Sequence, residues 1–285
     1  MRCVPLDHRV LRTYKHAKEH RFTMNPICLM YHDVIDGVAI NSGFSGLDAD
    51  SYKLDTAQFK AHLQAIAAVG RPVCTITEPA RYKSGSILFT FDDGGASAEP
   101  TAKLLEGYGW RGHFFIVTSK LGQPGFLRPE QVTSLHRRGH VIGSHSHTHP
   151  PRFSDLSYAE MVREWGESRR ILTDLIGEAP RVASVPGGFY SHRVADAARE
   201  AGFNALFNSV PTTRTFQREG LLVIGRYWTK RNTVAAQVQT IARGDIIPRL
   251  EQWALWNAKL PLKTIGGTGW LAARRWLYSR ARGTD

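Results

Sequence analysis

Residues 86–94 read Ser-Ile-Leu-Phe-Thr-Phe-Asp-Asp-Gly, a short apolar run that ends in two carboxylates and a glycine. A run of this length predicts a buried strand over 86–91. In parallel barrels, catalytic groups gather where such strands end. Asp92 and Asp93 point to opposite sides of the strand, and their like charges repel unless a cation or hydrogen bonds hold them. Because Asp-Asp-Gly is also a good turn sequence, a plain turn explains this stretch equally well on its own.

Outward from this stretch, short apolar runs alternate with helix-like segments. Strands are predicted over 26–31, 86–91, 113–118, 140–144, 182–185 and 204–208, and helices over 56–69, 97–107, 129–138, 157–176 and 191–201. The alternation predicts an α/β fold with a parallel sheet and helices outside it, as a barrel or as an open sheet. The length of 285 residues suits one such domain.

Three histidines occur within five residues in Gly143-Ser144-His145-Ser146-His147-Thr148-His149-Pro150, which follows another predicted strand. His145 and His149 are four residues apart, so one helical turn would place both rings on one side. Taken alone, this spacing also fits a chance surface cluster. Together with Asp-Asp at the end of an earlier strand, it indicates a metal site of two histidines and one carboxylate, which leaves a position open for water.

These motifs resemble those of the polysaccharide deacetylase family, the sugar N-deacetylases with a NodB-homology domain. Residues 90–94 reproduce its Thr-Phe-Asp-Asp-Gly motif, and 145–149 fit its His-Ser/Thr-x-x-His motif. The Gly-His-Phe-Phe at 112–115 is similar in style to the usual Ala-Thr-Phe-Phe. Met30-Tyr31-His32-Asp33-Val34 resembles the start of branches that act on exopolysaccharides. The resemblance covers about residues 26–230.

The resemblance implies a distorted (β/α) barrel of the NodB-homology type with fewer than eight complete units. It implies a divalent metal, most often zinc, held by Asp93, His145 and His149. Asp92 would be the general base, and Ser146 would hold the ligand loop by hydrogen bonding. The implied substrate is an N-acetylated glycan or glycolipid.

Two later motifs depart from the family pattern. Where the family often has Arg-Pro-Pro-Tyr-Gly, this chain has Ser-Val-Pro-Gly-Gly at 184–188, so Ser184 replaces the arginine that orients the base. Pro186 and Gly187 remain candidates for substrate binding. Arg226 is a candidate for the missing charge, and Arg181 is a second; either could equally be a surface arginine.

The family's late histidine, the general acid for the leaving amine, is also missing, because no histidine follows His192. An amide nitrogen must be protonated to leave, so another acid is needed. His32 ends the first predicted strand, which places it at the catalytic face of a barrel, and it is the candidate substitute. A purely structural hydrogen-bonding role for His32 is at least as consistent with the sequence.

The net charge of +12 is concentrated at the two ends of the chain. Residues 1–23 carry six Lys/Arg and two Asp/Glu, residues 249–285 carry seven and two, and residues 24–248 are nearly balanced. We therefore predict a basic N-terminal extension over 1–23, disordered or upstream of a true start at Met24, a deacetylase-like domain over 24–248, and a basic, Trp-rich helical tail over 249–285. The balanced body argues against a nucleic-acid partner.

The tail holds Trp253, Trp256, Trp270 and Trp276 among arginines, a composition suited to peripheral contact with an anionic membrane, although packing on the barrel or on a partner explains it as well. The three cysteines are widely spaced, and no secretory signal or membrane-spanning run is visible. The expected location is cytoplasmic, with contact at the membrane.

The sequence thus predicts a metal-dependent hydrolase that removes acetyl groups from N-acetylated sugars in exopolysaccharide or glycolipid synthesis. Two alternatives stay open: an amidohydrolase that acts on another small acylated molecule, and a carbohydrate-binding protein on the same fold that has lost catalysis. The intact carboxylate and histidine motifs favour an enzyme.

Overall fold

The computed structural model describes residues 25–36, 41–78 and 84–265 of the chain. Within them, nine strands form one sheet in the order β11-β1-β4-β5-β6-β7-β8-β10-β9. All neighbouring pairs are parallel except β9 and β10. The strands are β1 (Ile27–Tyr31), β4 (Ile87–Phe91), β5 (His113–Ile116), β6 (Val141–Ser144), β7 (Val182–Ser184), β8 (Ala205–Phe207), β9 (Thr215–Arg218), β10 (Leu221–Ile224) and β11 (Tyr227–Trp228).

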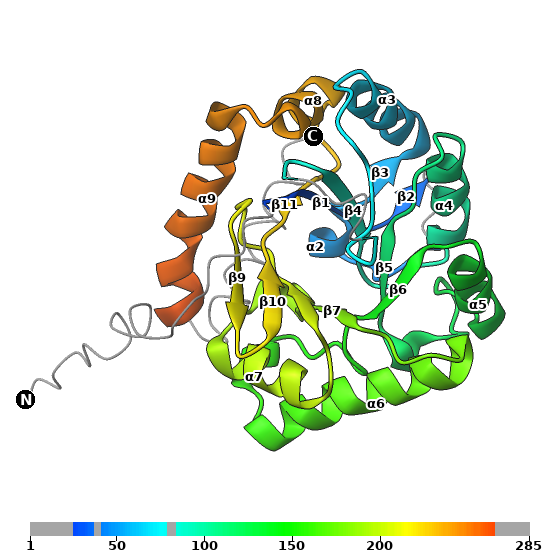
Figure 1. Ribbon diagram of the computed structural model, residues 1–285, viewed down its shortest axis with the longest axis vertical. Coiled ribbons are helices and arrows are strands. Elements are labelled where there is room, and N and C mark those ends of the chain that lie inside the picture. Colours follow the sequence, from blue (N-terminus) through cyan, green and yellow to red (C-terminus); the bar gives the residue numbers. More distant parts are fainter. Residues whose placement is uncertain (1–24, 37–40, 79–83, 266–285) are drawn as a thin grey trace, which may run out of the picture.

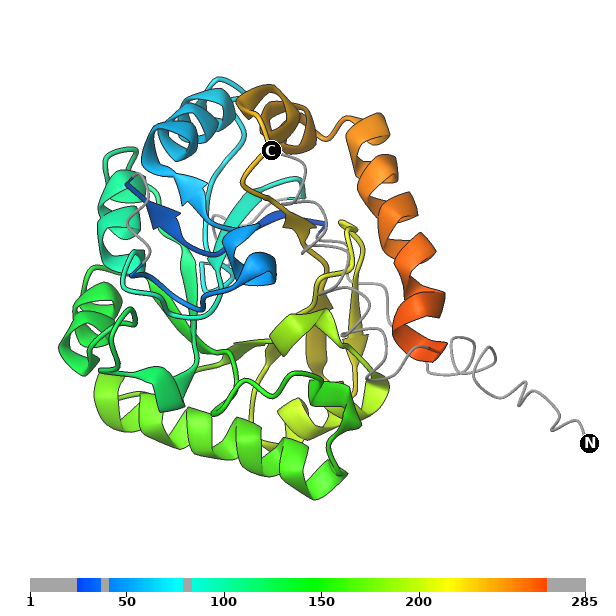
Figure 2. The ribbon, with the colours of Figure 1, turned by 180° about the vertical axis from the view of Figure 1, so that it is seen from behind.

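Helices lie around the outside of this curled sheet, as Figure 1 and the reverse view in Figure 2 show. They are α3 (Thr56–Ala67), α4 (Ala98–Glu106), α5 (Pro129–Arg137), α6 (Tyr158–Ile176), α7 (His192–Glu200), α8 (Ala235–Arg243) and α9 (Ile246–Ile265). Shorter elements are α2 (Leu47–Asp50), β2 (Val34–Ile35), β3 (Leu54–Asp55) and the 3-10 turns η1 (Thr118–Lys120), η2 (Phe153–Asp155) and η3 (Pro186–Gly188). The curled parallel sheet forms a half-barrel, which confirms the distorted (β/α) barrel.

Local sequence signals explain why the central elements form. Every residue of β4 is buried, as expected for a strand covered on both faces. Helix α6 begins with a capping box: Ser157 accepts from the backbone N–H of Glu160, whose carboxylate accepts from the N–H of Ser157. Strands β1 and β4 pair with Tyr31 opposite Phe91, so the residues that follow both strands reach the same edge of the sheet.

Helix α9 covers the edge strand β11. The side-chain amide of Gln252 donates to the carbonyl of Trp228 at 3.0 Å and accepts from its N–H at 3.2 Å, as a neighbouring strand would. Arg249 donates to the hydroxyl of Tyr227. The helix starts at Ile246, three residues before the predicted tail, and packs against the domain; Trp270 and Trp276 lie outside the described residues. In the described part of the chain, no helix is long and apolar enough to cross a bilayer.

A buried histidine at the start of β5 bonds to β4 and to Ile76, and we expect it to make stability depend on pH. His113 Nδ1 donates to the carbonyl of Phe89 at 2.8 Å, and its Nε2 accepts from the N–H of Ile76 at 3.0 Å. This pattern requires the neutral ring. Burial lowers the pKa of His113 to about 4, while the bond to Phe89 acts in the opposite direction.

We expect stability to fall as the pH drops from about 6.5, the pKa of an unfolded histidine, toward 4, because the unfolded chain binds more protons in that window. At pH 5 the loss from His113 alone is about 2 kcal/mol. Urea unfolding of wild type and His113→Asn at pH 7 and pH 5 measures it. The free energy of unfolding of the variant should be lower than that of wild type at pH 7 but should fall less between pH 7 and pH 5. Equal pH dependence of the two proteins would contradict this origin.

Candidate active site

The carboxylate pair follows β4 at the carboxyl edge of the sheet. Asp93 has a positive φ of 76°, in the left-handed region that aspartate tolerates better than most residues, and Gly94 follows with a φ of 75°. This abrupt turn sends the two side chains in different directions. Asp92 faces an arginine, and Asp93 faces the histidines that follow β6.

The structure brings Asp93, His145 and His149 together. One ligand atom from each residue lies within 4.8 Å of the others. Oδ1 of Asp93 is 3.5 Å from Nε2 of His145 and 3.7 Å from Nε2 of His149. The helical turn predicted for 145–149 is wrong: the segment is a loop, and Ser146 and His149 have positive φ values of 65° and 57°.

Ser146 and Ser184 hold two of the three histidines of this loop. The hydroxyl of Ser146 accepts from the N–H of His149 at 3.0 Å, which is the bonding predicted for Ser146. The Nδ1 of His145 lies 3.0 Å from the carbonyl of Ser184. A carbonyl only accepts, so Nδ1 carries the proton and Nε2 presents its lone pair to Asp93. A ligating histidine in a metal site is usually oriented in this way.

A divalent cation fits this donor set. Burial lowers the pKa of His145 to about 3 and also lowers that of His149, so both rings are neutral near pH 7. Burial raises the pKa of Asp93 to about 7; His32 opposes this, and the carboxylates of Asp92 and Asp33 add to it. The Nε2 lone pairs of both histidines therefore point at Oδ1 of Asp93 across 3.5–3.7 Å. Two ligands of a tetrahedral zinc ion, each about 2.0–2.1 Å from the metal, are about 3.3 Å apart.

Asp92 is held by a buried arginine. Nη1 of Arg226 donates to Oδ1 of Asp92 at 2.7 Å, and Nη2 donates to Oδ2 at 2.9 Å. Both side chains are buried. Burial alone would raise the pKa of Asp92, but Arg226 and, more weakly, His145 lower it well below its usual range. Asp92 is therefore ionised at neutral pH and fixed in one orientation.

Of the two arginines that the sequence offered as candidates, Arg226 is the one that contacts Asp92. Its guanidinium also donates to the hydroxyls of Thr90 and Ser184 and to the carbonyl of Asn208. Ser184, which replaces the family's arginine, donates in turn to Asp92 at 3.2 Å. Arg181 is exposed and is not part of this network. The positive charge beside Asp92 thus comes from Arg226, in the segment after β10. Ser184 is small enough to leave space for the guanidinium.

His32 follows β1 at the same edge. Its ring packs on that of Tyr52, with the centroids 4.6 Å apart. Its Nδ1 is buried and makes no hydrogen bond within the described residues. The charged form of His32 would lower the pKa values of Asp92 and Asp93, which places it near both carboxylates.

Pro186 and Gly187 form the 3-10 turn η3 after β7. Pro186 is buried, and Gly187 has a positive φ of 61°. A Cβ atom at Gly187 would lie 3.0 Å from the ring of Phe189. The turn therefore requires glycine for its positive φ and for the close approach of Phe189. These two residues are at the correct edge of the sheet, and their role in substrate binding stays a prediction.

Two residues near the cluster of Asp93, His145 and His149 could not be recognised from the sequence. Phe44 packs on the ring of His149, with a centroid distance of 4.9 Å. Glu164, on α6, accepts from the N–H groups of His147 and Thr148 and from the Thr148 hydroxyl, at 2.7–3.0 Å. Its position among other charged residues of an amphipathic helix gave no signal, because only the packing of α6 brings it to the loop.

We expect Glu164→Ala to weaken metal binding about 10- to 100-fold, the usual effect of losing a residue that supports the ligands. The loop between His145 and His149 would lose three hydrogen bonds. Competition with a chelating dye measures the affinity. Glu167→Ala, one turn further along α6, removes an exposed partner of Arg170 and is the control. Equal affinities in the two variants would show that Glu164 does not support the site.

Comparisons with known proteins agree with the predicted resemblance. Residues 80–206 match the model of the family described as polysaccharide deacetylase. The chain is 29% identical over 134 residues to a peptidoglycan-N-acetylglucosamine deacetylase of Bacillus cereus, covering 46% of each protein. It is 28% identical over 114 residues to chitin deacetylase 1 of Cryptococcus neoformans, covering 40% of this chain and 23% of that protein. A gellan lyase of a Bacillus species is 26% identical over 168 residues, 56% of this chain and 7% of that protein. The matches thus span less than half the length of these relatives.

Solved structures show the same fold at low sequence identity. A polysaccharide deacetylase from Bacillus cereus superposes with a TM-score of 0.65 at 16% identity, over 79% of this chain and 69% of that one. IcaB from Ammonifex degensii gives 0.64 at 20% identity, over 77% and 97%. A de-N-acetylase from Aggregatibacter actinomycetemcomitans gives 0.63 at 17% identity, over 76% and 99%.

Proposed function

Because residues 80–206 belong to the polysaccharide deacetylase family, we propose that this protein is a metal-dependent hydrolase that removes acetyl groups from N-acetylated sugars of a polysaccharide or glycolipid. The observation that carries the proposal is the pairing of two groups at one edge of the sheet. The cluster Asp93, His145 and His149 could hold a metal, and the neighbouring Asp92 is ionised and clamped by Arg226.

In this proposal Asp93, His145 and His149 hold a divalent ion, most simply zinc. When bound, such an ion polarises the amide carbonyl and makes water a stronger acid. Asp92 takes the proton from the attacking water. Its two bonds to Arg226 keep the carboxylate ionised and aimed, so the acceptor oxygen need not reorganise during the reaction.

Acetate release and metal content together test this function. Purified protein loaded with zinc, manganese or cobalt is incubated with a panel of N-acetylated glycans and small N-acetylated amides, and acetate is measured enzymatically. We expect metal-dependent release from glycans, and His145→Ala should lose metal and activity together. His136→Ala, on the outer helix α5, is the control.

Three outcomes would overturn parts of the proposal. Release from small amides alone would favour an amidohydrolase. Binding of glycans without release would favour a binding protein. Stoichiometric metal in a His145→Ala, His149→Ala double variant would remove the ligand assignment.

His32 is the proposed general acid that protonates the departing amine. Its position after β1 and its buried, unbonded Nδ1 support this role. We expect His32→Ala to keep metal and fold, to lower turnover about 100-fold, at the low end for a general acid, and to flatten the alkaline limb of the pH–rate profile. His192→Ala should do less. An unchanged pH profile in His32→Ala would exclude His32 as the general acid and make His192 the next candidate.

A further inference from the structure

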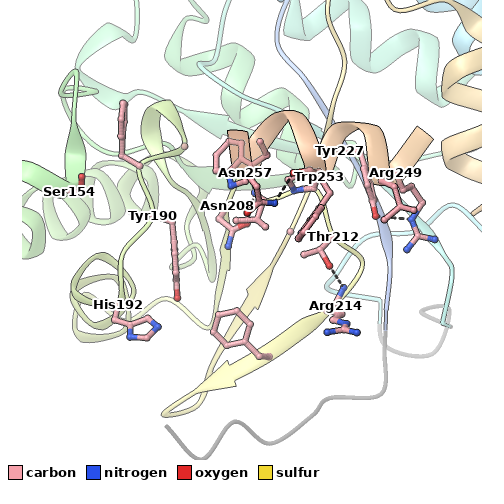
Figure 3. Close-up of a pocket in the computed structure, with 18 of the residues that line it drawn as sticks. Ser154, Tyr190, His192, Asn208, Thr212, Arg214, Tyr227, Arg249, Trp253 and Asn257 are labelled. Carbon is pink, nitrogen blue, oxygen red and sulfur yellow. Dashed lines mark hydrogen bonds between the residues drawn. The ribbon is translucent and has the colours of Figure 1, made fainter. Parts of the chain in front are cut away.

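A cavity of about 900 Å³ is lined by α9 and by the segments that follow β7, β8 and β10. Figure 3 shows side chains of this lining, among them Asn208 and Trp253. Leu250, Trp253 and Asn257 of α9 line one side, and Phe216 of β9 lines the other. The sheet is open here, because β9 and β11 are its two edges and α9 stands across the gap between them. The volume is in the range of sites for organic ligands, about 300–1,000 Å³.

This cavity shares a wall with the candidate active site. Gly225 and Tyr227 line the cavity, and Arg226 between them points to Asp92. Asn208 also lines the cavity, and its carbonyl accepts from Nε of Arg226. If a sugar lies at Asp92, only this one segment of chain separates the group attached to that sugar from the cavity.

The turn after β7 forms a second part of the common wall. Gly188, at the end of η3, has a φ of 69°, and a side chain there would lie 3.3 Å from the ring of Trp256 and 3.0 Å from Ser209. The absence of that side chain lets Trp256 close over the turn. The predicted binding residues Pro186 and Gly187 directly precede it.

The lining is mainly apolar and partly exposed to water. Ile246, Leu250 and Trp253 of α9 are 68%, 54% and 51% exposed, although each lines the cavity. Their spacing puts them on one stripe of the helix. A soluble domain that turns such a stripe into a cavity has apolar surface available for a ligand.

Cationic groups are interspersed in this apolar lining. The described lining residues include Arg152, Arg214 and Arg249 but no aspartate or glutamate. The three acceptors of Arg249 are neutral: the Tyr227 and Thr213 hydroxyls and the Gly244 carbonyl. Arg214 is exposed at the rim. Arg152 already pairs with Asp155 at 2.8 Å. An uncharged glycan would leave Arg214 and Arg249 without an anionic partner, whereas a phosphate would pair with them.

We propose that this cavity binds the phosphate and the long apolar chain of a lipid-linked substrate, whose N-acetylated sugar reaches Asp92 across the shared wall. The proposal rests on the proposed deacetylase function and narrows it to sugars carried on an anionic lipid. The apolar stripe of α9 takes the chain, and Arg214 and Arg249 take the phosphate.

Binding without chemistry tests the cavity separately from the function. Hexyl, octyl and decyl phosphate, each below its critical micelle concentration, are titrated calorimetrically into the full-length protein. We expect affinity to rise about fourfold per methylene, the gain from burying each CH₂ group. Decyl maltoside, which lacks the charge, should bind at least tenfold more weakly than decyl phosphate. Binding that ignores chain length or charge would overturn the proposal. The same titration on His145→Ala should be unchanged, because binding at the metal cluster would be lost there.

Two matched pairs of variants locate the site. Leu250 and Leu255 are 54% and 55% exposed on the same helix, but only Leu250 lines the cavity. Leu250→Asp should weaken decyl phosphate binding at least tenfold, and Leu255→Asp should not. Arg214→Gln should also weaken decyl phosphate binding at least tenfold, and Arg193→Gln, on the exposed side of α7, should not. Equal losses in both members of a pair would mean that the whole surface of α9 meets a lipid aggregate, and the cavity would be excluded as the site.

Acetate release then links the cavity to the substrate. N-acetylglucosamine 1-phosphate is compared with its decyl ester on the zinc-loaded enzyme. We expect the ester to have a KM at least tenfold lower. Leu250→Asp should abolish that advantage, whereas Leu255→Asp, outside the cavity, should keep it and leave turnover of the unesterified compound unchanged. Equal KM values for the two compounds would overturn the proposal. If neither compound releases acetate but decyl phosphate binds at Leu250, the deacetylase function fails and the lipid phosphate site remains.

Discussion

Asp92→Asn is expected to lower acetate release about 100-fold or more while leaving the bound metal in place, because a general base is usually worth this much. The amide has the shape of the carboxylate but cannot take a proton from water. Asp93 and the two histidines keep their positions, since Asp92 is not one of the three clustered donors. Single-turnover acetate release and metal analysis on the same sample measure the two properties.

Ser184→Ala is the matched control for this variant. Ser184 donates to the same carboxylate at 3.2 Å and accepts from Arg226, but it has no group that could act as the base. We expect a loss of less than tenfold. Near wild-type turnover in Asp92→Asn would rule out the base. Loss of metal in that variant would instead make Asp92 a ligand.

Arg226→Met is expected to destabilise the fold by about 3–5 kcal/mol, the usual cost of leaving one buried charge without its partner. Asp92 is 5% exposed, so water cannot replace the guanidinium. The carbonyl of Asn208 loses its bond from the same side chain. In the folded variant burial is then the main influence on Asp92, so the pKa of Asp92 rises and turnover falls with stability. Urea unfolding at pH 7 measures the first effect.

A double-mutant cycle separates the ion pair from the rest of the network. Asp92→Asn with Arg226→Met removes both charges, so the double variant should be less destabilised than the sum of the two single variants, by about 2 kcal/mol or more. Arg226→Lys should be intermediate, because it keeps the charge but loses the two-pronged contact. Additive effects in the cycle would show that Arg226 acts by filling space.

The helices and strands of the central domain were accessible from the sequence because each is set by local patterns. The buried run Ile87–Phe91 and the capping box at Ser157 needed no distant partner to be recognised. Elements with weak local patterns were missed, among them α8 and the two-residue strands β2, β3 and β11. These short strands exist because neighbouring chain offers hydrogen bonds, as Gln252 does for Trp228.

The grouping of Asp93, His145 and His149 was predicted from the spacing of the motifs, but the geometry of the group was not. The sequence indicated that Asp93, His145 and His149 act together. In the structure, 145–149 is a loop in which Ser146 and His149 have positive φ values, in place of a helical turn. Glu164 and Phe44 contribute contacts that only the packing of α6 and of the loop before α2 could supply.

The sequence alone thus determined the α/β class, the strand that ends in Asp92 and Asp93, and the likeness of two motifs to sugar deacetylases, because residues close in the chain encode all of these. Only the tertiary structure decided which arginine faces Asp92. Arg226 is 134 positions away along the chain, and the closing of the sheet brings it within 2.7 Å of that carboxylate. The cavity beside α9 was also decided only by the tertiary structure. It forms because α9 lies between β9 and β11, the two edge strands of the sheet.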